Sequence, residues 1–122
     1  MATVRYFVRD VPEAVSFYCD HLEFNVKMQF GSTIAILNRG DLTLWLAGSE
    51  ASASRPMPDG RQPGPGGWNR FVLEVKELST LVGKLKANKI NFRNDIVTGP
   101  GGQQILCEDP SGNVIELFQP AG

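Results

Sequence analysis

Apolar and polar positions along the first half of the chain predict a strand, a helix and then three more strands. Residues 4–8 form a short run rich in β-branched and aromatic side chains, which is typical of a strand. A helix is expected to begin at Asp10, because Pro12 suits an early helical position and apolar residues recur at helical spacing up to Leu22. Turns containing glycine then separate three expected strands. These strands cover residues 24–30, 33–38 and 42–47.

The second half repeats this order, which indicates an internal duplication. A shift of about 67 positions lays residues 4–24 over residues 71–92 with apolar positions coinciding, and a later shift of 72 lays residues 40–44 over residues 112–116. The second copy is therefore expected to contain a strand near its start and a helix from about Glu77. Its three remaining strands are expected over residues 91–97, 103–108 and 113–119.

The segment between the two copies has a different composition. Residues 48–67 are dominated by Ser, Ala, Pro and Gly, which cannot supply a core, so we predict a linker at the surface. A linker of this length is either a binding loop or a slack tether. The expected organisation is one domain over residues 1–122, with a first module at about 3–47 and a second at about 68–120.

Composition and charge narrow the class of partner. The chain has 12 basic and 13 acidic residues and no long run of either, so neither a nucleic acid nor a membrane is an expected partner. A small molecule is the better expectation. Because the start of the chain lacks the charged and apolar regions of a leader, we expect a cytoplasmic location. Cys19 and Cys107 are too few for a disulfide framework and are expected to be reduced thiols.

Two motifs resemble those of the vicinal-oxygen-chelate superfamily, the glyoxalase, bleomycin-resistance and dioxygenase type. The first copy reads Phe-Tyr at residues 17–18 and Leu-Glu-Phe at residues 22–24, and the second reads Glu-Asp-Pro-Ser-Gly-Asn-Val-Ile-Glu-Leu at residues 108–117. Members usually have Gly where this chain has Glu23. The resemblance implies an α+β fold in which two βαβββ modules form a cupped, roughly eight-stranded mixed sheet with the helices outside. It also implies a homodimer.

In metal-using relatives, the first and last strands of each module supply the ligands, usually His and Glu. The matching positions here are Thr3, Arg70, Leu44 and Glu116. Only Glu116 is a suitable ligand, and moving the alignment by one residue introduces no histidine. His21, the one histidine in the chain, lies at the end of the first predicted helix, where a partial positive charge is favourable. We therefore predict that the protein has no metal site and no other cofactor.

Without a metal, the predicted cavity would be lined by charged and aromatic side chains. Arg70 and Glu116 either pair with each other where relatives hold the ion, or bind ligand and act as a base. Arg5 and Glu74 either form a second pair or reach solvent at the rim. The side-chain amide of Asn69 either forms hydrogen bonds with a ligand or caps the start of its strand. The aromatic residues expected near the cavity are Phe7, Trp45, Trp68 and Phe118, for each of which core packing is the alternative.

Three functions follow from this resemblance. The first is a metal-free protein that binds a small organic molecule, like the bleomycin-resistance members, and the missing ligands favour it. The second is a metal-independent isomerase or lyase using Glu116 and Arg70, which the surviving carboxylate keeps open. The third is a metal-dependent lyase or dioxygenase, against which the histidine count argues. We place the first ahead of the second, and the residues do not decide whether the protein is an enzyme.

Overall fold

The structure is a computed structural model that describes residues 2–122. It divides into two compact units, which we describe separately. Unit 1 comprises Met1–Gly66 together with Pro110–Gly112, and unit 2 comprises Gly67–Asp109 together with Asn113–Gly122. The boundary at Gly67 falls at the end of the predicted linker, so the two units correspond to the two predicted modules.

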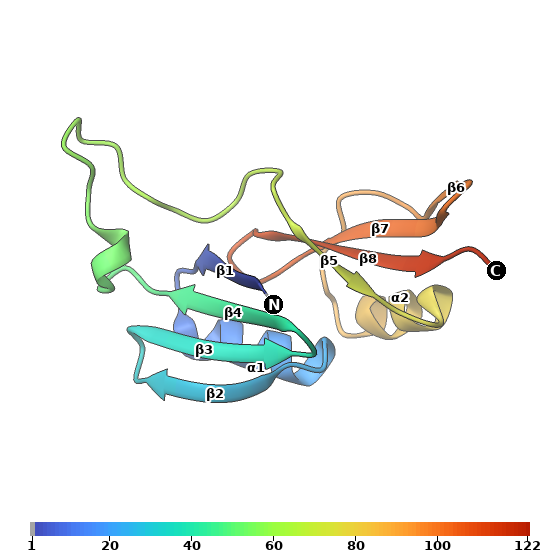
Figure 1. The fold of residues 1–122 in the computed structure, drawn as a ribbon, viewed down its shortest axis with the longest axis horizontal. Coiled ribbons are helices and arrows are strands. Elements are labelled where there is room, and N and C mark those ends of the chain that lie inside the picture. Colours follow the sequence, from blue (N-terminus) through green and yellow to red (C-terminus); the bar gives the residue numbers. More distant parts are fainter. Residues whose placement is uncertain (1) are drawn as a thin grey trace. The chain divides into compact units, whose positions relative to one another are not determined.

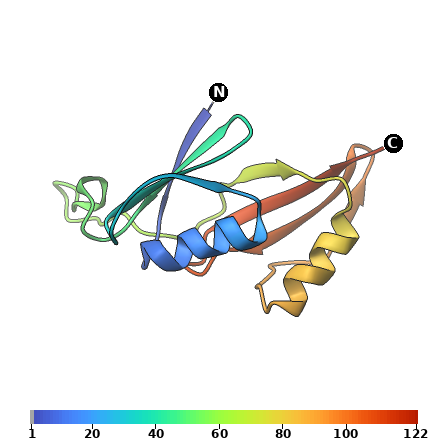
Figure 2. The same ribbon diagram turned by 90° about the horizontal axis from the view of Figure 1, so that it is seen from below.

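Unit 1 contains a four-stranded mixed sheet with one helix against it (Figure 1). Its elements are β1 (Ala2–Phe7), α1 (Val11–His21), β2 (Asn25–Phe30), β3 (Ile34–Arg39), β4 (Leu42–Ala47) and the 3-10 helix η1 (Ser52–Ser54). The strand order is β1-β4-β3-β2, with β1 and β4 parallel and the other neighbours antiparallel. Helix α1 lies along one face of this sheet, and we call the face away from α1 the open face of unit 1 (Figure 2).

The helix of unit 1 begins where the sequence predicts. The side chain of Asp10 accepts a hydrogen bond of 2.9 Å from the Glu13 amide, which satisfies one of the unpaired donors at the helix start. The buried side of α1 packs against the sheet, where Leu44 and Leu46 of β4 are fully buried. The buried residues of α1 are Val11, Ala14, Phe17 and Tyr18.

Unit 2 repeats this architecture. Its elements are β5 (Phe71–Glu74), α2 (Leu78–Ala87), β6 (Val97–Gly99), β7 (Gly102–Glu108) and β8 (Val114–Pro120). The strand order is β5-β8-β7-β6, with β5 and β8 parallel. Helix α2 begins next to Glu77 as expected, but the Glu77 side chain does not cap it. Instead, the side-chain oxygen of Gln119 accepts from the Leu78 amide at 2.7 Å.

The strand predicted over residues 91–97 is wrong. Residues 91–96 form no regular strand apart from a single bridge between Phe92 and Cys107, and β6 begins only at Val97. Residues 91–96 form no regular strand because of the hydrogen-bond partners of the Leu106 backbone on β7. Its carbonyl accepts from the Arg93 amide at 2.9 Å, whereas its amide donates to the Asn94 side chain at 2.9 Å. An asparagine side chain therefore takes the place of a backbone carbonyl in the ladder.

The two sequence motifs have local structural roles. Glu23 has a φ of 60°, in the left-handed region that favours glycine, which explains why relatives usually have Gly there. In the second motif, Asp109 and Asn113 are each only 3% exposed. The Asp109 carboxylate accepts from the amide of Asn113 at 2.9 Å and from its side chain at 3.0 Å. This motif therefore builds a closed turn between β7 and β8.

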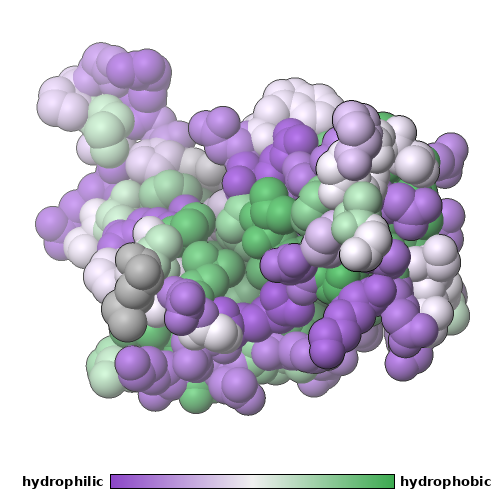
Figure 3. Space-filling model, turned by 45° about the vertical axis from the view of Figure 1, so that its right-hand side comes forward, coloured by the Kyte–Doolittle hydropathy of each residue, from purple (hydrophilic) through white to green (hydrophobic). Residues whose placement is uncertain are grey.

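The predicted fold class is confirmed, because each unit is a βαβββ arrangement with a mixed sheet and a helix on one face. The grouping of both modules into a single domain stays a prediction. None of the helices among residues 2–122 is long and apolar enough to cross a membrane. Hydrophobic residues nevertheless reach the surface among hydrophilic ones, as Figure 3 shows.

Candidate functional site

The open face of the unit 1 sheet carries a row of side chains that the strand register aligns. Trp45 on β4 pairs with Arg5 on β1 and with Ile36 on β3. Because side chains alternate between the two faces of a strand, these three lie on the face opposite α1. Trp45 is 40% exposed, while its neighbours in the chain, Leu44 and Leu46, are fully buried.

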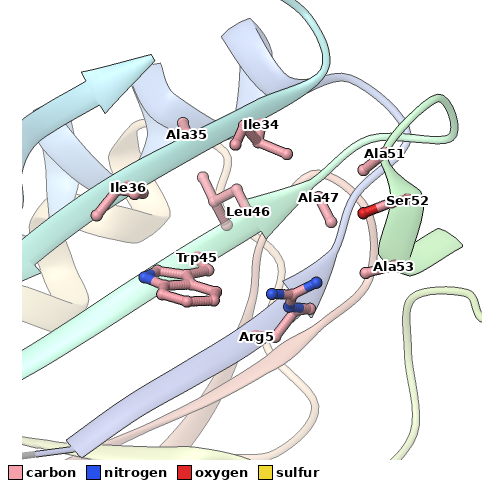
Figure 4. Close-up of a pocket in the computed structure, with 10 residues that line it drawn as sticks. All are labelled: Arg5, Ile34, Ala35, Ile36, Trp45, Leu46, Ala47, Ala51, Ser52 and Ala53. Atoms are coloured by element: carbon pink, nitrogen blue, oxygen red, sulfur yellow. The ribbon is translucent and has the colours of Figure 1, made fainter. Parts of the chain in front are cut away.

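This face contains a hollow of about 170 Å³ (Figure 4). Ile34, Ile36 and Trp45 line it from the sheet, and residues 51–53 line it from the start of η1. A cavity of about 150 Å³ holds one benzene ring, so this hollow accommodates a single ring. Drug-sized ligands need several hundred cubic ångströms, and a larger molecule would extend beyond it.

The wall at residues 51–53 is held in place by Gly48. The Gly48 amide donates to the Thr33 carbonyl at 2.8 Å, and the Gly48 carbonyl accepts from the Ser54 hydroxyl at 2.7 Å. A Cβ atom at Gly48 would lie 2.6 Å from the Ser32 carbonyl oxygen. Only glycine therefore allows the chain leaving β4 to approach the β2–β3 turn so closely. The first part of the predicted linker is thus an ordered wall of the hollow.

Arg5 is the charged side chain of the hollow. Its guanidinium carbon lies 4.9 Å from the centre of the Trp45 ring, which is a cation–π arrangement. Figure 4 shows the guanidinium beside that ring and toward residues 51–53. Arg5 takes part in none of the ion pairs that the described residues form. Because Glu74 belongs to unit 2, the pairing suggested for Arg5 and Glu74 stays a prediction.

The open face of the unit 2 sheet holds paired charges instead. Arg70 donates to one oxygen of Glu116 from Nε at 3.1 Å and from Nη2 at 3.0 Å. The two side chains are 32% and 12% exposed, so the pair is partly shielded from water. The pairing suggested by the sequence is therefore present in the structure. A role for either residue in binding or catalysis stays a prediction.

A second pair on this face involves Arg93, which the sequence did not single out. Its Nε donates to Glu108 at 2.8 Å, and its Nη1 donates to the Gly67 carbonyl at 2.7 Å. The guanidinium also stacks 4.5 Å from the centre of the Trp68 ring, and Trp68 is 67% exposed. These partners are 15 to 26 residues away in the sequence, and no local pattern could have identified them.

The remaining predicted site residues neither line the hollow nor take part in these two ion pairs. Phe7 is half-buried at the end of β1, where it pairs in register with Ala47. Phe118 is half-buried on β8 and pairs with Glu74, which is exposed at the end of β5. Asn69 is exposed just before β5. Binding roles for these residues stay predictions.

The strand register corrects one alignment made from the sequence. Glu116 pairs with Val72 in unit 2, and the matching pair in unit 1 is Trp45 with Arg5. The residue equivalent to Glu116 is therefore Trp45, and Leu44 points to the helix side, where it is fully buried. Among residues 2–122, no three or more His, Cys, Asp or Glu side chains are grouped so that they could hold a metal ion. Of the side chains at the family's ligand positions, which are Thr3, Trp45, Arg70 and Glu116, only Glu116 is a common metal ligand, and it is paired with Arg70. The absence of a metal site stays a prediction.

Neither the histidine nor the cysteines form a reactive centre in the structure. His21 lies in the last turn of α1, with its ring 5.8 Å from that of Phe17. Cys107 is fully buried, and burial raises the pKa of its thiol to about 12. Partial burial, and to a lesser extent the nearby Asp20, also raise the pKa of the Cys19 thiol. Both cysteines are therefore thiols rather than nucleophilic thiolates at neutral pH.

Solved structures of several proteins share this fold. A lactoylglutathione lyase from Agrobacterium tumefaciens is 20% identical, with a TM-score of 0.77 and coverage of 98% of this chain and 92% of that one. TnmS3, an antibiotic binding protein from Streptomyces sp. CB03234, is 22% identical, with a TM-score of 0.70 over 99% and 97%. A bleomycin-binding protein from Streptomyces verticillus, complexed with copper(II)-bleomycin, is 21% identical, with a TM-score of 0.64 over 98% and 95%. At these identities the likeness establishes the fold.

The family is established by the sequence itself. The family model for the Glyoxalase/Bleomycin resistance protein/Dioxygenase superfamily matches residues 1–117. The chain therefore belongs to this superfamily, as the two motifs and the duplication predicted. A search of curated proteins found no match.

Proposed function

We propose that this protein binds a small organic molecule with a planar apolar portion on the open face of the unit 1 sheet, without a metal ion. The observation that carries the proposal is the hollow of about 170 Å³ beside Trp45, which has an apolar floor and a wall held by Gly48. Apolar concave sites with a few polar groups are typical of small-molecule binding. Two proteins of the same fold are named as an antibiotic binding protein and a bleomycin-binding protein, which is consistent with this function.

Trp45 provides a direct test, because the chain contains only one other tryptophan. In a Trp68→Phe variant, fluorescence reports on Trp45 alone. Planar aromatic compounds should change its emission in a saturable way and raise the melting temperature. The matched control is a Trp45→Phe variant, in which the remaining Trp68 reports on unit 2 and should not respond. A response confined to Trp68 would assign the ligand to the other unit and contradict the proposal.

Glu116 supports a second candidate function, a metal-independent isomerase or lyase. Both hydrogen bonds from Arg70 go to Oε1 of Glu116, and the side chain is largely shielded from water. Its other oxygen is the group that would accept a proton in such a reaction. Once a compound that binds is known, turnover is measured in wild type and in Glu116→Gln. Turnover that disappears in the variant would place this function ahead of simple binding.

The metal-free state, the homodimer and the cytoplasmic location remain predictions that belong to this proposal. Elemental analysis of the purified protein, combined with thermal-shift titrations using Zn, Ni, Mn, Fe(II) and Mg, tests the first. Stoichiometric metal or saturable stabilisation by one ion would reopen the metal-dependent lyase or dioxygenase class. Light scattering coupled to size-exclusion chromatography measures the mass of the protein in solution and tests the second.

A further inference from the structure

We infer that the hollow in unit 1 selects anionic ligands, specifically compounds with a single aromatic ring that carries a carboxylate. This inference rests on the proposed function and adds the chemical class of the ligand. The observation behind it is the charge of the lining. Arg5 is charged, and none of the other nine lining residues is ionisable. A ligand in the hollow therefore meets one positive charge and no negative charge among the residues that line it.

Within the described residues of unit 1, the guanidinium of Arg5 contacts an aromatic ring and pairs with no carboxylate. Four ion pairs formed by the described residues engage Arg9, Arg61, Arg70 and Arg93, and none of them includes Arg5. The contact that holds Arg5 is the face of the Trp45 ring, at 4.9 Å. This contact involves no hydrogen bond to an oxygen atom, so the N–H groups of the guanidinium are available as donors to a ligand. Two of these donors match the two oxygens of a carboxylate.

The size of the hollow limits the remainder of the ligand. A hollow of about 170 Å³ that is lined by Trp45 and the isoleucines of β3 fits one six-membered ring, with little room for a second. The hydroxyl of Ser52, on the wall, offers one more hydrogen-bonding group for a polar substituent. Ring and carboxylate together correspond to a benzoate-like compound.

The test compares benzoate with benzamide, which has the same ring and nearly the same shape but no charge. Binding is followed by the fluorescence of Trp45 in the Trp68→Phe variant. For ligands of this size we expect dissociation constants on the order of 1 mM, within reach of titration. Benzoate should bind about tenfold more tightly than benzamide, because a hydrogen bond to a charged group is stronger than a neutral one. The preference should shrink as NaCl is raised, since Arg5 is exposed.

Variants assign the preference to Arg5. In Arg5→Gln, the affinity for benzoate should fall to that for benzamide. The dissociation constant of benzamide should change less than about twofold. Arg5→Lys should retain part of the preference, because it keeps the charge but loses the two-pronged geometry. Arg61→Gln is the matched control, since it removes one positive charge from an exposed pair in the linker and should leave the preference intact.

The outcomes separate this inference from the proposed function. Equal binding of benzoate and benzamide to the unmodified hollow would overturn the inference and leave the proposed function standing. A tenfold preference that survives Arg5→Gln would also overturn it. If neither compound changes Trp45 emission at concentrations about ten times the expected dissociation constant, the inference fails. The proposed function fails as well only if none of the planar aromatic compounds changes this emission. The comparison of benzoate with benzamide is made in protein that keeps Arg5 and the rest of the hollow. It therefore gives an answer even if the Arg5 variants do not fold.

Discussion

The open faces of the two sheets share one backbone design and differ in chemistry. In unit 2, Glu116 is held by Arg70, and Glu108 is held by Arg93. In unit 1, the position equivalent to Glu116 is Trp45, and the arginine beside it has no carboxylate partner among the ion pairs of the described residues. Two carboxylates of unit 2 are therefore paired with arginines of the same unit, whereas Arg5 of unit 1 lies against the ring of Trp45. The two units thus share one sheet topology, and the side chains on their open faces differ.

Among the variants that test this difference between the units, Gly48→Ala is expected to change stability and ligand binding most. The new methyl group would lie 2.6 Å from the Ser32 carbonyl oxygen and 3.2 Å from a Val11 methyl group, so the wall of the hollow must move. Overpacking of this kind costs about 1–3 kcal/mol of unfolding free energy. We also expect loss of the Trp45 response to ligand. Urea unfolding measures the first and fluorescence titration the second.

Gly83→Ala is the matched control in unit 2. Gly83 lies in α2, and a Cβ atom there would meet nothing within 4 Å. Because alanine favours a helix over glycine, this variant should be more stable by about 0.5–1 kcal/mol and should still bind ligand. A Gly48→Ala protein with unchanged stability and binding would show that the close approach of residue 48 to the β2–β3 turn does not shape the hollow.

The fold was predictable from the sequence because its signals are local and occur twice. The cap at Asp10 and the apolar spacing of α1 are patterns within a few residues, and the duplication repeated them for α2. The failures come from contacts between distant residues. Gln119 caps α2 from 41 residues away, and Asn94 replaces a strand partner for Leu106. No spacing rule contains such information.

The candidate site was predictable only in part, for a related reason. The sequence named Arg5 and Trp45 among the residues expected at the cavity, and the ligand positions of metal-using relatives suggested the Arg70–Glu116 pair. The alignment of the last strands was off by one residue, and a shift of one residue moves a side chain to the other face of a sheet. Arg93 was missed because its partners are distant in the chain.

The second prediction compares the two arginines directly. Arg70→Met would leave the carboxylate of Glu116, 12% exposed, without its partner, so we expect a loss of about 1–2 kcal/mol in unfolding free energy. Arg5→Met removes only an exposed cation–π contact and should cost less than about 1 kcal/mol. Urea denaturation of both variants measures the difference. Equal losses would mean that Arg5 has a structural role like that of Arg70.

A third prediction uses the buried cores, where Cys107 in unit 2 is equivalent to Leu37 in unit 1; both are fully buried. Burial raises the pKa of Cys107 in the folded state to about 12, above its ordinary value of 9.0. The folded protein therefore holds this proton more tightly than the unfolded chain. The resulting stability is complete below pH 9.0 and is lost as pH rises toward 12.

Cys107→Val removes this titration while keeping a similar volume. At pH 10, one unit above the ordinary value, wild type should have lost about 1 kcal/mol more than the variant, relative to pH 7. Both proteins contain the same tyrosines and lysines, so their contribution cancels in the difference. The measurement is urea unfolding of both proteins at pH 7 and pH 10. Identical pH dependence would mean that the thiol ionises without disturbing the core.

The smallest effect is expected from Glu116→Gln on ligand affinity. If the ligand occupies the unit 1 hollow, the charge of Glu116 contributes little to its binding, and the dissociation constant for benzoate should change less than about threefold, equivalent to about 0.7 kcal/mol. Arg5→Gln, titrated under the same conditions, provides the contrasting large change. Affinity that falls in Glu116→Gln as much as in Arg5→Gln would mean that the ligand depends on the chemistry of both copies. The division between a satisfied unit 2 and a binding unit 1 would then be wrong.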